Sequence, residues 1–254
     1  MFALAATVGD REGALTRKLE SLLPHVTDRF DAIAVQATTL THRDVVAALE
    51  EAGATVRLEE PDAGRIGLHR RRAVELAMSS SEAGRIAYFD LDHLLRWIEN
   101  DEAELDEILS RSEQWDCTVI GRGPLSFAKL PERLAATERI VNHIYELATG
   151  SRWDLMMAVR SLSRSAAASI VERCAVETIG NDVAWPLHCE GEGLSVGYLE
   201  AEGLTYRTNV DYAEGFEDSK DRDPRAWATR VYLAAQQVDA MLPYIETKRL
   251  PPSY

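Results

Sequence analysis

The sequence predicts an α/β fold with a mostly parallel central sheet flanked by helices. In the first half, short apolar runs alternate with segments in which apolar residues recur at helical spacing. Strands that alternate with helices in this rhythm are typical of parallel strands joined by crossover helices. The composition, with 46% hydrophobic and 28% charged residues, is that of a globular chain and excludes a collagen-like or wholly disordered one.

The first half contains four expected strands and three expected helices. The strands are short apolar runs that cover Phe2–Val8, Asp31–Ala37, Ala54–Leu58 and Arg85–Phe89. The helices between them cover Ala14–Leu23, Asp44–Ala52 and Leu68–Met78, and the first carries four leucines on one face. We expect Thr41 to cap the second helix, which stops at Gly53.

The second half is less regular. We expect strands at Asp116–Gly121, Leu194–Leu199 and Leu204–Thr208, and helices at Leu130–Ala148 and Ser163–Cys174. Residues 213–223 are acidic and predict a surface loop, after which Asp223 and Pro224 begin a final helix. An apolar stripe on that helix is expected to face the core, with a homodimer interface as the alternative; it consists of Trp227, Val231, Ala234, Val238 and Met241.

Charge, cysteine content and hydropathy limit the function classes. The net charge of −14 repels phosphate backbones, so no nucleic-acid partner is expected, although a small phosphorylated ligand remains compatible. Three cysteines at no metal-ligand spacing are typical of a reducing compartment. The first residues lack the basic segment of a signal peptide, and no run reaches the ~18 apolar residues of a membrane span. We therefore expect a cytoplasmic protein without a transmembrane segment.

The sharpest motif follows the fourth expected strand, where Asp90 and Asp92 flank Leu91. Ligands of open α/β sheets bind at the carboxyl edge of the strands. Residues two apart on a strand face the same way, so both carboxylates can address one hard cation. Mg²⁺ typically takes one or two carboxylates together with the oxygens of a diphosphate. The alternative is a solvated acidic loop.

A glycine-rich, basic segment leads into the third helix. Gly64 and Gly67 permit close approach of the backbone to a ligand, and Arg65 and Arg71 can bind phosphate bidentately at a helix N-terminus that favours anions. These residue types predict a phosphate-binding segment. The alternative is a solvated basic helix face, because three consecutive arginines cannot all point inward.

The ordered set of motifs resembles the GT-A glycosyltransferases of the family 2 type that includes polyprenyl-phosphate mannose and glucose synthases. The resembling segments cover roughly residues 2 to 208 and are Gly64–Ala77, Asp90–Asp92, Asp116–Arg122, Leu130–Arg133, Asn142, Thr149–Gly150 and Trp153–Arg164. The resemblance implies a GT-A type fold with a Rossmann-like nucleotide-binding half and an acceptor half. Residues 1–254 would form one domain, with 1–121 as the nucleotide-sugar half, 122–212 as the acceptor and catalytic half, and 213–254 as a loop and C-terminal helix.

The same resemblance implies a nucleoside-diphosphate sugar donor over the sheet edge, with Mg²⁺ or Mn²⁺ held at its diphosphate by Asp90 and Asp92. It implies that Asp154 lies near that centre as a catalytic carboxylate. The other residues that it places at the donor are Thr7, Gly9, Asp10, Arg122, Arg133 and Arg160. The acceptor would be a sugar, a small molecule or a lipid phosphate, either soluble or at the periphery of a membrane.

Two regions depart from the family's pattern. The loop Thr7–Glu12 replaces a Pro-x-x-Asn-Glu segment, and Gln36–Leu40 replaces a short acidic motif that contains serine. Both regions contact the nucleoside in the family, so the sequence leaves the base and the sugar open.

Asp182, Trp185 and His188 form the remaining candidate group. A carboxylate on a loop before an aromatic residue suits a base that activates the acceptor, and Trp185 offers a face to a sugar ring. His188 is a candidate third metal ligand. The alternatives are a helix cap for Asp182 and an ordinary hydrogen-bonded histidine for His188.

Two other functions remain open at this point. The segment Phe89–Asp92 also resembles the nucleophile motif of haloacid-dehalogenase-type phosphatases, in which Asp90 would attack phosphorus and Asp92 would be the acid and base. Leu94 stands where that motif has Thr or Val, and the strand is the fourth rather than the first. A non-catalytic nucleotide-sugar binder is the second alternative.

Overall fold

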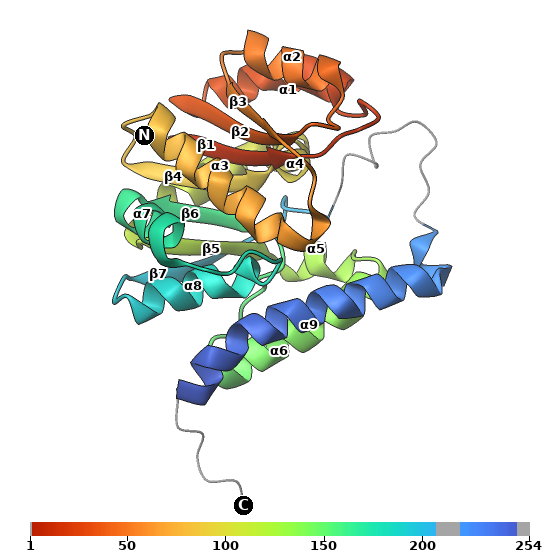
Figure 1. Ribbon diagram of the computed structural model, residues 1–254, viewed down its shortest axis with the longest axis vertical. Helices are drawn as coiled ribbons and strands as arrows, with labels where there is room; N and C mark the ends of the chain where they lie inside the picture. Colours follow the sequence, from red (N-terminus) through yellow and green to blue (C-terminus); the bar gives the residue numbers. More distant parts are fainter. Residues whose placement is uncertain (1, 207–218, 248–254) are drawn as a thin grey trace, which may run out of the picture.

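One sheet organises the part of the chain that the computed structural model describes, residues 2–206 and 219–247. Its strands are β1 (Phe2–Val8), β2 (Ala32–Thr38), β3 (Thr55–Glu59), β4 (Arg85–Asp90), β5 (Cys117–Arg122), β6 (Val159–Ser163) and β7 (Val196–Ala201). They lie in the order β3-β2-β1-β4-β6-β5-β7 (Figure 1). β6 runs antiparallel to β4 and β5, and the other neighbouring strands are parallel. The expected α/β fold with a mostly parallel sheet is therefore confirmed.

Helices cover both faces of the sheet. They are α1 (Thr16–Thr27), α2 (Arg43–Glu51), α3 (Ile66–Ser80), α4 (Leu91–Arg111), α5 (Pro124–Ala128), α6 (Glu132–Thr149), α7 (Arg164–Arg173), α8 (Asn181–Gly191) and α9 (Pro224–Thr247). Short 3₁₀ turns lie at Ala63–Arg65, Ser112–Gln114 and Lys220–Arg222. No helix in these described ranges is long and apolar enough to span a membrane.

The alternation of side chains along β1 explains the two layers. Phe2, Leu4, Ala6 and Val8 belong to one buried cluster, which α1, α2 and α4 complete. Ala3 and Ala5 point to the other face and belong to a second cluster with residues of α3, α7 and α8. Since both faces are covered, β1 is apolar at almost every position, as expected for a central strand of a parallel sheet.

Most expected helices and strands are confirmed, although their ends are shifted. The prediction that Thr41 caps α2 was wrong. His42 caps this helix, because its Nδ1 accepts the backbone N–H of Asp44 at 3.3 Å. The hydroxyl of Thr41 instead accepts the backbone N–H of Thr38 at 3.2 Å. Thr41 therefore closes the turn after β2 and cannot satisfy the first turn of the helix.

Four helices and strands were not predicted: β6, α4, α5 and α8. β6 contains Arg160 and Ser161, which interrupt the apolar pattern, yet both are buried. The expected strand Leu204–Thr208 was wrong over 204–206, which form no strand, and 207–208 lie outside the described residues. Most of the expected acidic loop 213–223 lies outside them as well.

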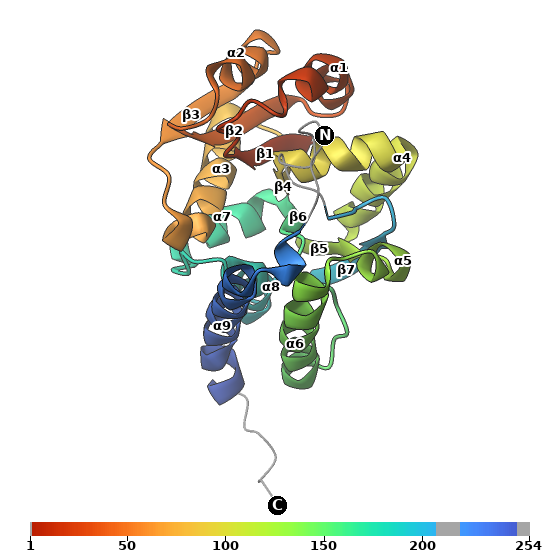
Figure 2. The same cartoon turned by 90° about the vertical axis from the view of Figure 1, so that its right-hand side faces the viewer.

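The final helix α9 begins at Pro224 as expected, and Asp223 Oδ1 accepts the backbone N–H of Arg225 at 2.9 Å. α9 lies against α6 and α8 rather than against the sheet (Figure 2). Its apolar stripe is only partly core, because Met241 is buried whereas Val231 is 58% exposed.

A close backbone contact fixes the start of α3. The N–H of Leu68 donates to the carbonyl of Glu177 at 3.0 Å, and Gly67 lies so close that a Cβ there would collide with the carbonyl of Thr178. Gly67 therefore holds α3 against the segment that leads into α8.

The substitution Gly67→Ala should destabilise the fold by about 2 kcal/mol, because an added methyl group forces the two backbones apart. Gly84→Ala is the matched control, since no atom lies within 4 Å of a Cβ at that position. Urea unfolding of both variants measures the difference. Equal free energies of unfolding would contradict the packing role of Gly67.

Candidate functional site

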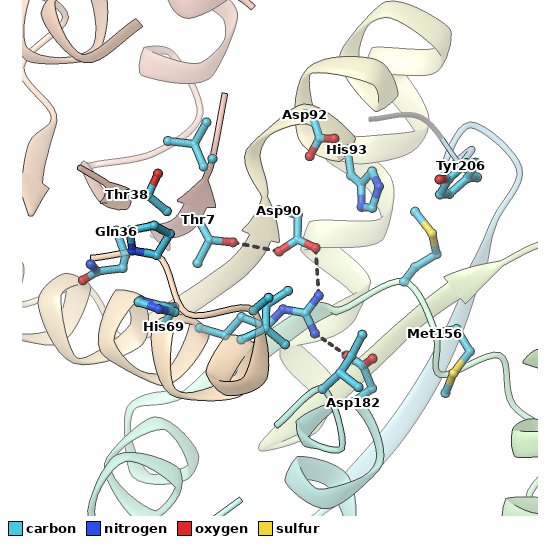
Figure 3. A pocket seen from close by; sticks show the side chains of 18 of the residues that line it. Thr7, Gln36, Thr38, His69, Asp90, Asp92, His93, Met156, Asp182 and Tyr206 are labelled. Carbon is cyan, nitrogen blue, oxygen red and sulfur yellow. Dashed lines mark hydrogen bonds and ion pairs between the residues drawn. The ribbon is translucent and has the colours of Figure 1, made fainter. Parts of the chain in front are cut away.

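A cavity of about 500 Å³ lies at the carboxyl ends of β1, β2 and β4 (Figure 3). Thr7, Gln36 and Asp90 represent the three strands in its wall. Further lining residues come from α3, α4, α6, α8 and α9 and from the loops between elements; they include Asp62, His69, Arg70, Asp92, His93, Leu134, Glu138, Met156, Asp182, Tyr206, Arg230 and Gln237. This is the edge at which ligands of parallel α/β sheets bind.

A buried guanidinium between two carboxylates forms the centre of the wall. Arg70 donates to Asp90 Oδ2 at 2.9 Å and to Asp182 Oδ1 at 2.7 Å. The second oxygen of Asp90 accepts the hydroxyls of Tyr88 at 2.6 Å and Thr7 at 2.8 Å. The second oxygen of Asp182 accepts the amide of Gln237 at 2.9 Å. All four carboxylate oxygens therefore have donors.

The two carboxylates differ in their pKa. Burial alone would raise the pKa of Asp90, but the charge of Arg70, aided by His93 and the two hydroxyls, lowers it to about 2. Burial keeps the pKa of Asp182 above its ordinary value despite Arg70 and Arg160. Asp182 is the more enclosed side chain, with 1% of its surface exposed against 21% for Asp90. A buried carboxyl with a raised pKa is better suited to accept a proton near neutral pH.

The helical phase of α3 explains why Arg70 reaches the cavity and its neighbours do not. The buried positions of this helix include Gly67, Arg70, Val74 and Ala77, at spacings of three and four residues. Arg71 points elsewhere, donates to the carbonyl of Cys174 and lies 3.5 Å from Glu177.

A second ion network closes the opposite side of the cavity. Arg122 donates to both oxygens of Asp154, at 2.7 and 3.0 Å, and also to Glu138. Arg230 of α9 donates to the other oxygen of Glu138 at 2.8 Å. Burial raises the pKa of Glu138, whereas Arg122 outweighs burial at Asp154 and lowers its pKa.

Several polar atoms of the lining residues are buried and have no hydrogen-bond partner among the described residues. They are Gln36 Nε2, His69 Nε2, Arg70 Nε, Arg230 Nε and both ring nitrogens of His93. Arg57 Nε donates to Gln36 Oε1 at 2.7 Å, so the amide of Gln36 is held in one orientation. Buried polar groups are normally paired, and such a gathering of unpaired ones is typical of a ligand site.

Few side chains at the cavity could hold a divalent cation without a ligand. No group of three or more His, Cys, Asp or Glu side chains with metal-ligand geometry occurs within residues 2–206 and 219–247. Asp92 lines the cavity at the first turn of α4, beside His93. One carboxylate completed by diphosphate oxygens and water is a common Mg²⁺ arrangement, so these residues fit a cation that arrives with its nucleotide.

The structure brings some of the sequence-predicted site residues together at this cavity and places others elsewhere. Those that line it are Thr7, Gly9, Asp90, Asp92, Arg122 and Asp182. Asp154 does not line the cavity; it accepts hydrogen bonds from Arg122, which does. Arg160 is buried and donates to the carbonyls of Val159, Leu155 and Asp182.

The remaining predicted residues lie outside the cavity wall, each with a partner of its own. Asp10 accepts the N–H of Leu15, and the N–H of Gly64 donates to Asp62. Arg65 pairs with Glu177, and Arg133 pairs with Asp221. His188 is hydrogen-bonded to Ser169 at 2.8 Å, on the face of the sheet that α7 and α8 cover, which agrees with the ordinary-histidine alternative. Gly67 and Arg71 hold α3 to the segment before α8.

Sequence reasoning did not single out Arg70, Tyr88, Glu138, Arg230 or Gln237. The phase of the third helix could have favoured Arg70 over Arg71, because Arg70 lies on the face of Gly67 and Val74. Tyr88 lies two residues before Asp90 and faces the same way. Arg230 and Gln237 lie on α9, and no local signal connects that helix with the sheet edge.

No family model matches the sequence, and no curated protein matches it by sequence. Similar solved structures are known. The crystal structure of M. tuberculosis glucosyl-3-phosphoglycerate synthase aligns with 100% of this chain and 82% of its own, with a TM-score of 0.55 and 13% identity. The same synthase with Mn²⁺, UDP and phosphoglyceric acid aligns with 100% and 80%, with a TM-score of 0.52 and 13% identity. The structure of a mycobacterial protein aligns with 100% and 76%, with a TM-score of 0.58 and 15% identity. The likeness shows that this chain has their fold, which confirms the expected GT-A type.

The substitution Arg70→Met should cost about 3–5 kcal/mol at neutral pH, because it leaves two buried carboxylates without their cation. Arg71→Met, on the same helix but outside the cavity, is the matched control and should cost less.

The pH dependence of this loss has a defined sign. The pKa of Asp90 is about 2 in the native protein, below its ordinary 3.8, so its pairing stabilises the fold above about pH 4 and is lost as the pH falls toward 2. Without Arg70, burial raises the pKa of Asp90, and the variant loses stability as the pH rises. Thermal unfolding should therefore show a smaller deficit at pH 4 than at pH 7. A deficit that does not depend on pH would contradict the ion-pair role.

Proposed function

We propose that this protein is a glycosyltransferase that moves a sugar from a nucleoside-diphosphate sugar to an acceptor with the help of Mg²⁺ or Mn²⁺. The observation that carries the proposal is the position of Asp90 and Asp92 at the carboxyl ends of the parallel strands of a GT-A type sheet. Both residues lie in the wall of a cavity of about 500 Å³. A cavity of this size suits a ligand as large as a nucleotide sugar.

In this proposal residues 1–121 bind the donor. The nucleoside lies near Gln36, Thr38 and His69, which Figure 3 shows on one side of the cavity. Gln36 and His69 support this placement, since each has a buried nitrogen without a partner among the described residues. UDP is the nucleotide named for the similar synthase, and it is therefore the first donor base to test.

Asp92 would hold the metal at the diphosphate, with His93 as a candidate additional ligand. When bound, it neutralises the negative charge that develops on the departing diphosphate. All oxygens of Asp90 already accept hydrogen bonds, so we assign Asp90 to holding Arg70 at the cavity wall. This refines the expectation that both carboxylates bind the metal.

Asp182 is the proposed catalytic carboxylate. It lines the cavity, and burial raises its pKa. Arg70 and Gln237 fix its two oxygens, so it can orient a hydroxyl group of the donor or acceptor sugar without reorganisation.

Residues 122–212 would bind the acceptor together with α9. Arg122 and Arg230 lie at this end, and Arg230 Nε has no partner in the described part of the chain. We propose a small anionic acceptor. The similar synthase is described in complex with phosphoglyceric acid, which makes phosphoglycerate a reasonable first compound in an acceptor screen, ahead of lipid phosphates.

The phosphatase alternative is less well supported. Leu94 stands where the phosphatase motif has Thr or Val, and Asp90 is held in an ion pair with Arg70. A covalent aspartyl phosphate trapped on Asp90 would nevertheless favour it over the glycosyltransferase.

Calorimetric titration with UDP, GDP, ADP and CDP should show binding that requires Mn²⁺ or Mg²⁺, because the diphosphate reaches Asp92 only through the cation. Hydrolysis or transfer assays with the corresponding sugars then identify the donor. Failure of every nucleotide to bind with metal present would refute the proposal, and binding without any transfer would favour a non-catalytic binder.

The substitution Asp92→Asn should lower turnover by roughly 10²–10³, because the cation loses its protein carboxylate. The melting temperature without metal should stay the same or rise slightly, since one negative charge leaves an acidic edge. Asp31→Asn is the control, because Asp31 precedes β2 at the opposite edge of the sheet. A variant that has a lower melting temperature and loses activity only in proportion to its unfolded fraction would show that Asp92 is structural.

A further inference from the structure

One face of α9 is left uncovered by the rest of the described chain. Seven positions alternate in steps of three and four residues along this face, and all are exposed: Arg225, Ala228, Tyr232, Ala235, Asp239, Leu242 and Glu246. Gln237 and Met241 lie on the opposite face and are buried against the body of the protein. The uncovered face, which we call the α9 seam, therefore follows a helical stripe over about 30 Å.

Both α9 and its neighbour α6 carry exposed apolar side chains. Tyr232 is 64% exposed, Leu242 is 42% exposed, and Val231, which borders the seam, is 58% exposed. Ile140 and Leu147 on the adjoining α6 are 58% and 72% exposed. Large exposed apolar side chains on α9 are candidates for contact with a partner.

We propose that the α9 seam binds the α9 seam of a second copy of this chain, with the two helices antiparallel about a two-fold axis near Ala235. The seam is complementary to itself in this arrangement. Arg225 and Glu246 lie ten and eleven residues from the axis, so each arginine meets the partner's glutamate. Tyr232 and Asp239 lie three and four residues from it, so each tyrosine hydroxyl meets a carboxylate. A surface that pairs with its own copy is the requirement for a two-fold dimer.

Small residues allow the helices to approach at the axis. Ala235 lies at the centre, with Ala228 farther along the same face. None of Arg225, Asp239 and Glu246 forms an ion pair with another residue in the described ranges, so their charges are available to a partner.

A second copy fits this seam better than a lipid surface does. The seam carries one arginine against two carboxylates. Helices that lie on membranes carry a basic polar face that attracts anionic lipids, and this one is acidic.

Light scattering after gel filtration and sedimentation velocity should both show a dimer. The protein concentration should span about 1–100 µM, because a modest interface dissociates in that range. Tyr232→Glu should shift the protein to monomer. Leu58→Glu is the matched control, because Leu58 is also large and 51% exposed but lies on β3, and it should leave the dimer intact.

Charge reversal tests the antiparallel register. Arg225→Glu and Glu246→Arg should each weaken the dimer at least roughly tenfold, since each places like charges together at two symmetric positions. An equimolar mixture of the two variants should restore a mixed dimer, because every pair is then opposite in charge. The double variant should restore the homodimer.

Cross-linking tests the position of the axis. Ala235→Cys should form a disulfide-linked dimer under mild oxidation, whereas Thr229→Cys should not, because only Ala235 meets its own copy. The native cysteines are buried and leave the background low. A monomer at every concentration would overturn the proposal, and so would a dimer that survives Tyr232→Glu or whose charge-reversed variants fail to rescue one another.

Discussion

The cavity depends on one guanidinium buried between two carboxylates. Arg70 comes from α3, Asp90 from the end of β4 and Asp182 from the start of α8, so one ion cluster joins segments far apart in the sequence. Each buried ion costs several kcal/mol in lost hydration, which only close pairing and complete hydrogen bonding offset. The hydroxyls of Tyr88 and Thr7 and the amide of Gln237 complete the hydrogen bonding of the carboxylates, whereas Arg70 Nε has no partner among the described residues. The cluster therefore tolerates one geometry, and this geometry fixes how α3 and α8 meet the edge of the sheet.

The same cluster leaves the sheet edge negatively charged. Arg70 contributes one positive charge against the two carboxylates that it joins, and Asp92 adds a further acidic group nearby. An anionic diphosphate would be repelled from such an edge in the absence of a counterion. In the proposed function, the requirement for a divalent cation thus follows from the structural core of the site as much as from the chemistry of the leaving group.

The fold was largely predictable, whereas the site was predictable only in part. The apolar run before Asp90 indicated the strand and the edge of the sheet at which it ends. The expectation that Asp90 and Asp92 face the same way on one strand was wrong, because β4 ends at Asp90 and Asp92 lies in the first turn of α4. The direction of a side chain on a helix depends on which face of the helix is buried. The run of three arginines on α3 does not by itself show that Arg70 is the one that faces the cavity. β6 was missed because Arg160 and Ser161 are polar and become buried only through tertiary hydrogen bonds. The sequence around Arg230 and Gln237 contains no local pattern that predicts the contacts of α9 with the cavity.

The contribution of α9 to the cavity wall has a consequence for the order of events during synthesis. Gln237 and Arg230 hold carboxylates that belong to α8 and α6, yet they emerge from the ribosome after every other described element. Domains begin to fold while the chain is still growing. The nascent sheet and its helices can therefore form before the pocket is finished, and a chain interrupted before α9 would carry a folded but incomplete site.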